Sequence, residues 1–373
     1  MLSGSHRLLA PSSTVLEVSL EPVYNLLNSL SGLEAIESNP GLDDWTIETS
    51  ARLTNEQRTL VRIFFYYIGV EVLSNLIEPG PATESFPAYL NALAVLDAVQ
   101  LRDTILRHAT ESDTQHLHPD YEPHEPMDTR RALADVNYMI AYTERVSQKD
   151  ELIDRDLIIR LHALLVDAPQ LKATLINFLR TMWDDYLAAE WERVRPILQQ
   201  SVDALSQIDT SNIPIMVALQ RIIGRDLNSV LEASELAKFE RIQFIPSKHN
   251  GPYITTFGNA TTLRIVFGAR IPPEMKHGDS PLDNAELLNR LKAMGDETRL
   301  NILIALRRQG ELATGEIMDQ FDLNKSAASR HLRSLHASGL INERRDVDGK
   351  GKFYTLSDEG IAEMVDTVQT LLR

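Results

Sequence analysis

The order of short segments at the C-terminal end of the chain constrains the fold more than any other feature. From residue 283 to 338, four apolar-periodic segments begin after capping residues and end at glycines or short turns. Two strands with alternating apolar residues follow, near Leu340 to Arg345 and Phe353 to Leu356, with a glycine-rich tip between them. A last amphipathic helix completes the series. This order predicts one compact unit over residues 283–373.

The fourth helix of this unit, predicted over residues 325–338, has two chemically different faces. At about 100° per residue, hydroxyl and guanidinium groups gather within about a third of the circumference, and alanine and leucine lie opposite. Guanidinium forks match guanine edges in the major groove of DNA, while serine and lysine reach phosphates or bases. Helix, turn, helix and a basic hairpin is the order of a winged helix-turn-helix domain. The polar face holds Ser326, Ser329, Arg330 and Arg333, and the apolar face holds Ala328, Leu332 and Leu335.

Charge is distributed unevenly along the chain. The whole chain carries a formal net charge of −16, but residues 283–373, with 13 Lys and Arg against 15 Asp and Glu, contribute only −2. Within residues 325–352, seven basic residues outnumber three acidic ones. Charge alone fits a solvated helix and hairpin equally well, but together with the helical face it favours a local DNA-binding surface. The residues expected to contact DNA are Lys325, Ser326, Ser329, Arg330, Arg333, Arg344, Arg345, Lys350 and Lys352.

Several stretches of the unit follow a family pattern: residues 291–303 (LKAMGDETRLNIL), the set Ser326, Ser329, His331, Leu332 and Leu335, residues 339–341 and residues 354–356. In these residues the unit resembles the DNA-binding domain of the ArsR family of bacterial regulators. The resemblance covers roughly the last quarter of the chain. It implies a homodimer that binds a palindromic operator, usually as a repressor, with a recognition helix at 325–338 and a wing at 341–356.

Many members of that family sense metals, but the matching positions here lack the ligands. Ala313 and Gly315 stand where the family has its cysteine pair. The family's alternative site on the last helix needs carboxylates and histidines, and residues 357–373 contain no histidine. The chain has no cysteine, which also excludes disulfides and thiolate chemistry. We therefore predict no metal and no cofactor.

The first 282 residues predict a mostly helical region that ends in strands. Apolar residues change from helical spacing to alternation in Arg241–Pro246, Tyr253–Phe257 and Thr261–Phe267, which predicts strands, with Gly258-Asn259 as a hairpin turn. The expected fold is mainly α with small antiparallel β elements, a helical N-terminal domain followed by a C-terminal winged helix-turn-helix. The expected divisions are a flexible tail at 1–13, a mostly helical sensor or dimerisation region at 14–270 that ends in a small antiparallel sheet, a linker at 271–282 and the DNA-binding domain at 283–373.

Four residues of this region are candidates for contact with a small-molecule effector. Trp183, Tyr186 and Trp191 are spaced as on one helix, where core packing or a subunit contact is the simpler interpretation and a ligand pocket the alternative. His249 follows Lys248 in a predicted loop, where a polar surface position is the simpler interpretation and a ligand contact the alternative. The nearby acidic residues are interpreted as a solvated face: Asp184, Asp185, Glu190 and Glu192.

A histidine-rich loop offers groups that zinc or nickel could use. Its proline-rich composition favours a flexible surface segment instead. The residues concerned are His116, His118 and His124, with Asp120 and Glu122.

Length and composition limit the remaining classes. With 373 residues the chain has room for two or three domains, each with a core. The best candidate for a spanning helix, Leu60 to Leu73, is interrupted by Arg62 and Glu71 and is shorter than the roughly 18 residues required. We expect a soluble, cytoplasmic protein without a membrane partner.

Two classes of function remain. The first is a one-component regulator whose N-terminal region senses a signal or dimerises while its C-terminal unit binds DNA. The second is an enzyme or scaffold with an accessory DNA-binding tail. The sequence contains no glycine-rich phosphate loop, nucleophile elbow or His-Glu-x-x-His pattern. This favours the regulator and predicts that the chain is not an enzyme.

Overall fold

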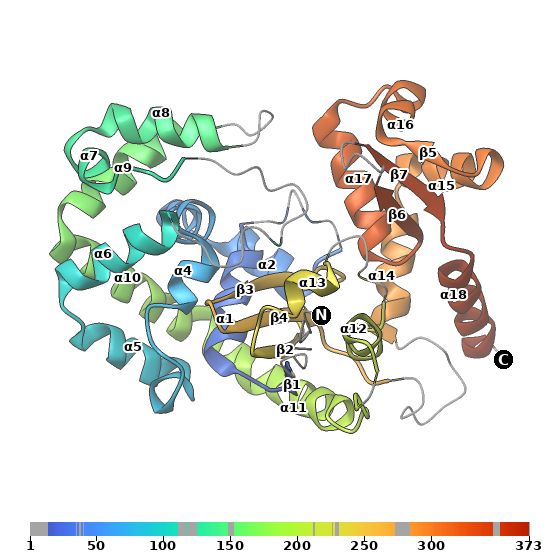
Figure 1. Cartoon of the computed structure of the whole chain (residues 1–373), viewed down its shortest axis with the longest axis horizontal. Helices are drawn as coiled ribbons and strands as arrows, with labels where there is room; N and C mark the ends of the chain where they lie inside the picture. The colour runs from blue at the N-terminus through green and yellow to red at the C-terminus, as the bar shows by residue number, and fades with distance from the viewer. Residues whose placement is uncertain are drawn as a thin grey trace, which may run out of the picture.

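The computed structural model describes residues 14–34, 36, 39, 41–110, 117, 125–147, 153–211, 213–225, 227, 231–272, 284–345 and 351–372. Predictions for the tail at 1–13, for His116, His118 and His124, for most of the linker and for Lys350 therefore lie outside the described residues. A large region, from β1 to β4, lies beside a smaller C-terminal unit (Figure 1). The protein is mainly α with small sheets, as the sequence predicts.

The helices of the large region are mostly short and amphipathic. Two π-helical segments join neighbouring helices without a break: Arg62–Gly69 lies between α3 and α4, and Trp183–Leu187 lies between α10 and α11. The helices are α1 (Pro22–Gly32), α2 (Asp44–Arg52), α3 (Asn55–Val61), α4 (Val70–Ser74), α5 (Phe86–Val95), α6 (Ala98–Thr110), α7 (Thr129–Ala134), α8 (Val136–Val146), α9 (Arg155–Val166), α10 (Ala168–Met182), α11 (Ala188–Leu205), α12 (Ile215–Ile223) and α13 (Ala233–Leu236).

Helical periodicity builds the main core of this region. On α10, residues four positions apart point to the same side, and Leu171, Leu175 and Leu179 are fully buried. Phe178 of the same helix stacks on Phe64, with ring centroids 5.5 Å apart. These side chains belong to one continuous cluster that also takes residues from α1, α5, α6, α9 and α11.

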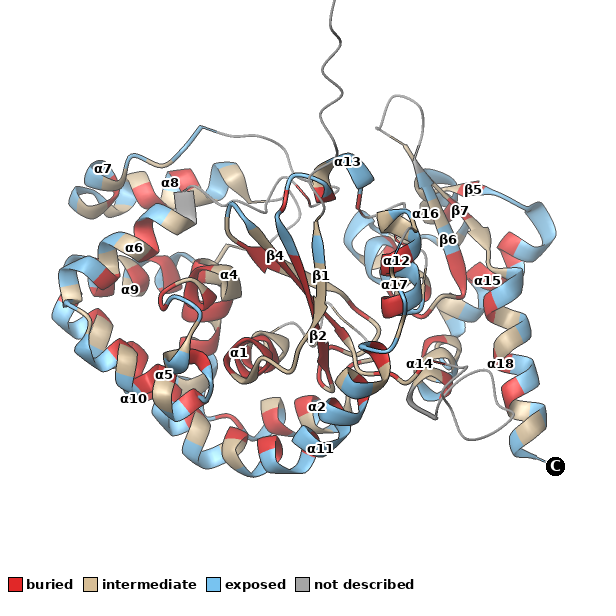
Figure 2. Cartoon of the chain, turned by 60° about the horizontal axis from the view of Figure 1, so that its bottom comes forward, coloured by how far each residue is buried: buried red, intermediate tan, exposed pale blue. Residues whose placement is uncertain are grey.

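A four-stranded sheet lies at the centre of the large region (Figure 2). Its strands are β1 (Val15–Val18), β2 (Arg241–Ser247), β3 (Thr255–Gly258) and β4 (Thr262–Gly268), in the order β1-β2-β4-β3. The expectation of a small antiparallel sheet is corrected here, because β1 pairs with β2, and β2 with β4, in parallel. Only the β3–β4 hairpin is antiparallel. Parallel pairs need long crossover connections, and the helices between β1 and β2 provide one that local sequence patterns do not show.

Both faces of this sheet are covered. Ile242 and Phe244 of β2 share a cluster with residues of α12 and α13, whereas Ile245 faces Tyr24 of α1. This alternation follows the period of two that the sequence shows. The sheet therefore connects the helical core to the side of the region that meets the C-terminal unit.

The C-terminal unit has its own core and the predicted order of elements. Buried residues from every helix of the unit and from all three of its strands form this core, among them Ile302, Ile317, Leu335 and Tyr354. The strands form an antiparallel sheet in the order β5-β7-β6. The elements are α14 (Asn284–Met294), α15 (Glu297–Gln309), β5 (Leu312–Ala313), α16 (Thr314–Phe321), α17 (Lys325–Ala337), β6 (Ile341–Arg345), β7 (Lys352–Leu356) and α18 (Asp358–Leu371).

The two regions meet along α14 and α17, on the side of the C-terminal unit opposite α18 (Figure 1). Lys292 Nζ of α14 lies 3.2 Å from Asp44 Oδ1 of α2. Arg270, which follows β4, donates from Nε to Glu286 Oε1 of α14 at 3.3 Å. Across the described part of the chain, no helix combines the length and apolar character needed to cross a membrane.

Candidate nucleic-acid interface

The turn between α14 and α15 explains a central part of the sequence pattern. Asp296 caps α15, because its carboxylate accepts a hydrogen bond from the backbone N–H of Arg299 at 2.9 Å. The Arg299 guanidinium donates to the carbonyl oxygens of Ala293 and Lys292, at 2.5 and 2.9 Å. These carbonyls belong to the last turn of α14, where they lack helical partners. One motif thus ends one helix and begins the next.

A second turn sets the position of α17. Asp322 ends α16 in the left-handed conformation, with φ of 51°. Asn324 caps α17 by accepting a hydrogen bond from the backbone N–H of Ala327 at 2.8 Å. Ala328, Leu332 and Leu335 are buried and hold the inner face of the helix against the core. The opposite face is therefore fixed toward the outside.

The outer face of α17 carries the predicted DNA-contacting side chains. All five are exposed: Lys325, Ser326, Ser329, Arg330 and Arg333. Among the described residues, the guanidinium groups of Arg330 and Arg333 have no carboxylate within ion-pair distance. Two unneutralised guanidinium groups about one helical turn apart can form the forked hydrogen bonds that read base edges in a major groove.

The predicted wing residues differ from those of the helix. Arg344 of β6 bonds to both oxygens of Glu311, at 3.0 and 2.6 Å, and lies over the ring of Phe353. Lys352 Nζ lies 3.6 Å from Glu343 Oε1. Arg345 pairs with Lys352 in the β6–β7 ladder, and its side chain lies outside the described set. Exposed ion pairs are weak, so phosphate can replace these partners.

His331 lies on the inner side of α17. Its Nδ1 atom is 3.6 Å from Asp296 Oδ1, and its side chain is mostly covered. Burial lowers the pKa of His331, while the charge of Asp296 opposes that shift. The ring is therefore mainly neutral at pH 7 and links α17 to the start of α15 rather than adding positive charge to the outer face of α17.

The aromatic candidates for an effector site lie in the core of the large region. Trp183 stacks on Phe86 with ring centroids 5.5 Å apart, and Trp191 is 8% exposed. The Tyr186 hydroxyl lies 3.3 Å from Gln57 Oε1. None of the three lines the cavity that lies between the large region and the C-terminal unit. Their predicted role as ligand contacts stays a prediction without support from this geometry.

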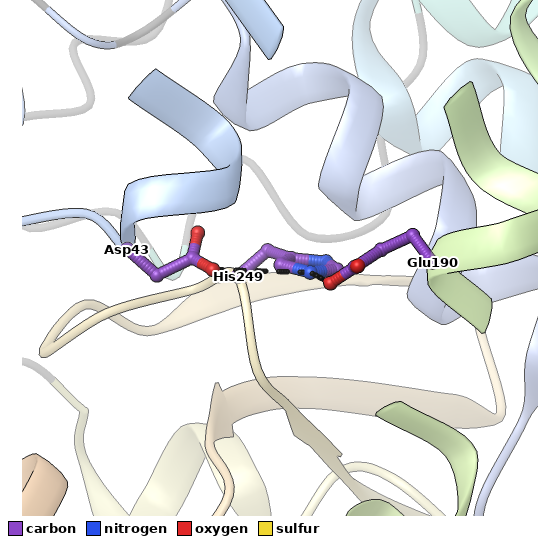
Figure 3. Close-up of side chains that lie close together, drawn as sticks. All are labelled: Asp43, Glu190 and His249. Atoms are coloured by element: carbon purple, nitrogen blue, oxygen red, sulfur yellow. Dashed lines mark hydrogen bonds and ion pairs between the residues drawn. The ribbon is translucent and has the colours of Figure 1, made fainter. Parts of the chain in front are cut away.

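His249 and Glu190 are buried, which corrects the expectation of a surface loop for the histidine and of a solvated position for this glutamate. The other acidic residues of the predicted face, Asp184, Asp185 and Glu192, are exposed. His249 is 2% exposed and Glu190 is 5% exposed. His249 Nε2 lies 2.7 Å from Glu190 Oε1 (Figure 3). On the other side of the ring, Nδ1 lies 2.8 Å from the hydroxyl of Ser29. Trp45 stacks on the imidazole with ring centroids 4.4 Å apart. The sequence gives no local signal of this network, because its members are far apart along the chain.

The same network holds a set of groups that could bind a metal ion. Asp43, Glu190 and His249 place one ligand atom each within 4.8 Å of one another (Figure 3). However, Arg193 donates to both oxygens of Glu190, at 2.7 and 2.5 Å. Burial alone would raise the pKa of Glu190, but hydrogen bonds from His249 and Arg193 lower it below its ordinary value. A cation at this position would compete with the guanidinium, so the geometry favours an internal ion-pair network.

Comparison with known proteins places the similarity in the C-terminal unit. Residues 296–343 match the family model described as bacterial regulatory protein, arsR family. The chain is 37% identical over 89 residues to the transcriptional activator HlyU of Vibrio cholerae, which covers 24% of this chain and 80% of that protein. It is 32% identical over 87 residues to a homologue of the cadmium resistance regulatory protein CadC of Staphylococcus aureus, which covers 23% and 68%.

Two further similarities each cover about a fifth of the chain. The chain is 39% identical over 66 residues to the arsenical resistance operon repressor of Escherichia coli, over 18% of this chain and 55% of that protein. A solved structure of reduced HlyU from Vibrio cholerae is 40% identical and covers 22% of this chain and 83% of its own, with a TM-score of 0.19.

Proposed function

The chain belongs to the arsR family of bacterial regulatory proteins and is a DNA-binding transcriptional regulator, and on this basis we propose that a homodimer of it binds a palindromic operator in the cytoplasm and represses transcription. The observation that carries the proposal is the outer face of α17. Its serine, lysine and arginine side chains are exposed, and the opposite face is buried. A helix held in this way can lie in a major groove with its outer face against base edges.

The proposed contacts divide into two kinds. Arg330 and Arg333 read base edges, because forked guanidinium groups bond to guanine O6 and N7. Lys325, Ser326 and Ser329, together with the wing residues Arg344, Arg345, Lys350 and Lys352, hold the phosphate backbone and set the register of the helix.

The proposed homodimer uses an apolar face that the C-terminal unit leaves uncovered. Leu300 and Ile304 of α15 are each 40% exposed, and Val365 of α18 is 44% exposed. All three line a shallow groove of about 590 Å³ between α15 and α18. Helix α18 lies on the side of the unit away from the large region (Figure 1). The same face of a second copy would cover these side chains about a twofold axis. A twofold dimer presents two recognition helices, which a palindromic operator matches.

The direction of control is the part of the proposal that needs a cellular test. Related proteins bear both names: an arsenical resistance operon repressor and a transcriptional activator. We assign repression here and expect deletion of the gene to raise transcription from the bound operator. A fall in that transcription would contradict repression and leave DNA binding intact.

DNA binding is tested with single arginine variants of the full chain. Arg330→Ala and Arg333→Ala should each lower operator affinity about tenfold or more and weaken discrimination at one base pair per half-site, because each good base contact contributes about 1–3 kcal/mol. Arg130→Ala, an exposed arginine on α7, is the matched control and should leave affinity unchanged. Footprints identical to wild type for both α17 variants would remove the assignment of the recognition helix.

A further inference from the structure

A cavity of about 530 Å³ lies between the large region and the C-terminal unit. Its walls come from α2, the segment between β2 and β3, the end of α12, α14 and the end of α17. Small-molecule sites in proteins have volumes of about 300–1,000 Å³ and prefer the boundary between domains. Because both regions supply walls, an occupant of this cavity would contact the sensor and the DNA-binding unit together.

The cavity is more basic than the protein around it. Six Lys and Arg residues and four Asp and Glu residues line it, whereas the chain as a whole has a net charge of −16. Arg193, Arg270, Arg290 and Lys292 are each paired with a carboxylate. The remaining two cations, Arg225 and Lys248, have no carboxylate partner among the described residues.

Arg225 is the more deeply placed of these two cations. Its Nη1 atom donates to the carbonyl oxygen of Ala337, at 2.6 Å, in the last turn of α17. Burial lowers the pKa of Arg225 to about 10, so its guanidinium remains charged at pH 7. A guanidinium has five N–H donors, and the contact with one carbonyl leaves most of them without a partner among the described residues. Charge and donor capacity both favour an anion beside it.

Aromatic and apolar side chains form another part of the cavity wall. Trp45 lines it and is held in place by stacking on His249. Tyr253 and Ile254 contribute from the segment that follows His249, and Leu288 contributes from α14 with 48% of its surface exposed. Cavities that bind organic ligands combine such apolar walls with a few polar groups that fix the orientation.

We propose that this cavity binds a small organic anion, a carboxylate, sulfonate or phosphate attached to an aromatic body, with the anionic group on Arg225 and Lys248 and the ring against Trp45 and Tyr253. The assignment concerns binding and stands whether or not the chain represses transcription. It gives the large region a ligand of defined chemistry, at a place next to His249, which the sequence offered as a candidate ligand contact.

The cavity is also connected to the recognition helix. Besides the bond from Arg225 to Ala337, the side chain of Tyr253 is hydrogen-bonded to Ser334 of α17. The charge of Arg333 acts on the same phenol and opposes the rise in its pKa that burial causes. Arg333, a proposed base-reading residue, therefore lies beside the large region, whose residues 1–282 carry a net charge of −14.

This connection gives the ligand a defined effect, which rests on the proposed function. Leu288 of α14 and the end of α17 also line the cavity, so a ligand held on Arg225 and Lys248 contacts both regions. Such a ligand binds the docked arrangement more tightly than a separated one, and so shifts the population toward docking. Docking keeps the acidic region beside the end of α17, where it repels DNA phosphates. We therefore expect an aromatic anion to weaken operator binding.

Binding is tested by calorimetry on the full chain without DNA, using indole-3-acetate and 1-anilinonaphthalene-8-sulfonate as probes. Each should bind at one site per chain and displace the other. Neutral indole-3-acetamide should bind with an affinity at least about tenfold lower, because it lacks the charge-assisted bonds. No saturable binding by either anion, or equal affinities for indole-3-acetate and its amide, would overturn the proposal.

Variants locate the site. Arg225→Met and Lys248→Met should each weaken anion binding about tenfold, and the controls Arg241→Met and Lys238→Met, on exposed cations outside the cavity, should not. Arg225→Met also removes a contact between the regions, so Lys248→Met, which breaks no hydrogen bond among the described residues, is the decisive variant if the first fails to fold. Unchanged anion affinity in Lys248→Met would overturn the assigned position.

A separate measurement tests the effect on DNA. At saturating indole-3-acetate, operator affinity should fall about fivefold or more, and Lys248→Met should respond only at higher concentrations. Anion binding with unchanged operator affinity would overturn the coupling and leave the ligand site standing. Failure of the protein to bind any operator would reject the proposed function, whereas the calorimetry would still decide the ligand site.

Discussion

The large region and the C-terminal unit place their charged side chains in opposite ways. In the large region, Glu190 and His249 are buried and bonded to each other, and Arg264 of β4 is 3% exposed over the ring of Tyr24. In the C-terminal unit, Arg330 and Arg333 are exposed without an ion-pair partner among the described residues. Buried charges with partners hold a fold together, whereas exposed ones without partners are available to another molecule. The difference marks the outer face of α17 as the part of these two sets that is available to another molecule.

Breaking the buried network should have the largest effect on stability. Glu190→Ala should lower the free energy of unfolding by about 3 kcal/mol, because it leaves the ring of buried His249 without its partner. All three tryptophans lie in the large region, so their fluorescence in urea follows that region alone. Glu192→Ala, an exposed residue on the same helix, is the control and should change stability by less than about 0.5 kcal/mol. Similar losses of unfolding free energy for both variants would show that the buried contact of Glu190 with His249 adds nothing to stability.

A charge on the uncovered apolar face of the C-terminal unit should test whether this exposed surface contacts a second copy of the chain. Val365→Asp should raise the dissociation constant of the dimer about tenfold or more, because a carboxylate would be desolvated in the interface. Sedimentation over a concentration series measures this, and Val99→Asp, on an exposed valine of α6, is the matched control. A wild-type chain that stays monomeric at high micromolar concentration would contradict the proposed dimer face.

The buried pair should also respond to pH in a defined direction. The pKa of Glu190 is lowered in the folded chain, so its ionisation contributes stability above the ordinary value of 4.5, and this contribution is lost as pH falls through the lowered value. The difference in unfolding free energy between wild type and Glu190→Gln should therefore shrink between about pH 6 and pH 3. A difference that is constant over this range would show that the charge of Glu190 contributes nothing.

The wing should show the smallest effect. Arg344→Ala should weaken binding about threefold for all DNA sequences alike and reduce the salt dependence by about one phosphate contact. Glu311→Gln removes the ion-pair partner of Arg344 and should strengthen DNA binding slightly. The reason is that the guanidinium then binds a DNA phosphate without first giving up the carboxylate of Glu311. Loss of affinity at one base pair only would instead indicate that Arg344 reads sequence.

Much of the C-terminal unit could be predicted because its determinants are local. The cap at Asp296 and the two faces of α17 depend on residues within a few positions of one another. The order of helices and strands follows from the same short-range signals. The start of α16 is less plain in the sequence, since Thr314 is the first residue of that helix and the carboxylate of Glu316 accepts a hydrogen bond from the backbone N–H of Ala313.

The large region was decided by contacts that no local pattern shows. Its strands and helices were predictable as elements, but the parallel pairing of Val15 with Arg241 joins residues more than 200 positions apart. The bond of His249 to Ser29 joins residues 220 positions apart, and that of Arg225 to Ala337 joins residues 112 positions apart. A charged residue is predicted to lie on the surface until its partner is known, because the free-energy cost of burying it without a partner would be too high.

The amino-acid sequence by itself therefore determined the helix-turn-helix, its wing and the chemistry of its outer face, since periodicity and capping act over a single turn or strand. Tertiary structure alone decided the direction of the central strands, the burial of Glu190 and His249, and the cavity against α17. Those features arise where segments far apart in the sequence contact each other, and the free energy of such a contact depends on the residues of both segments.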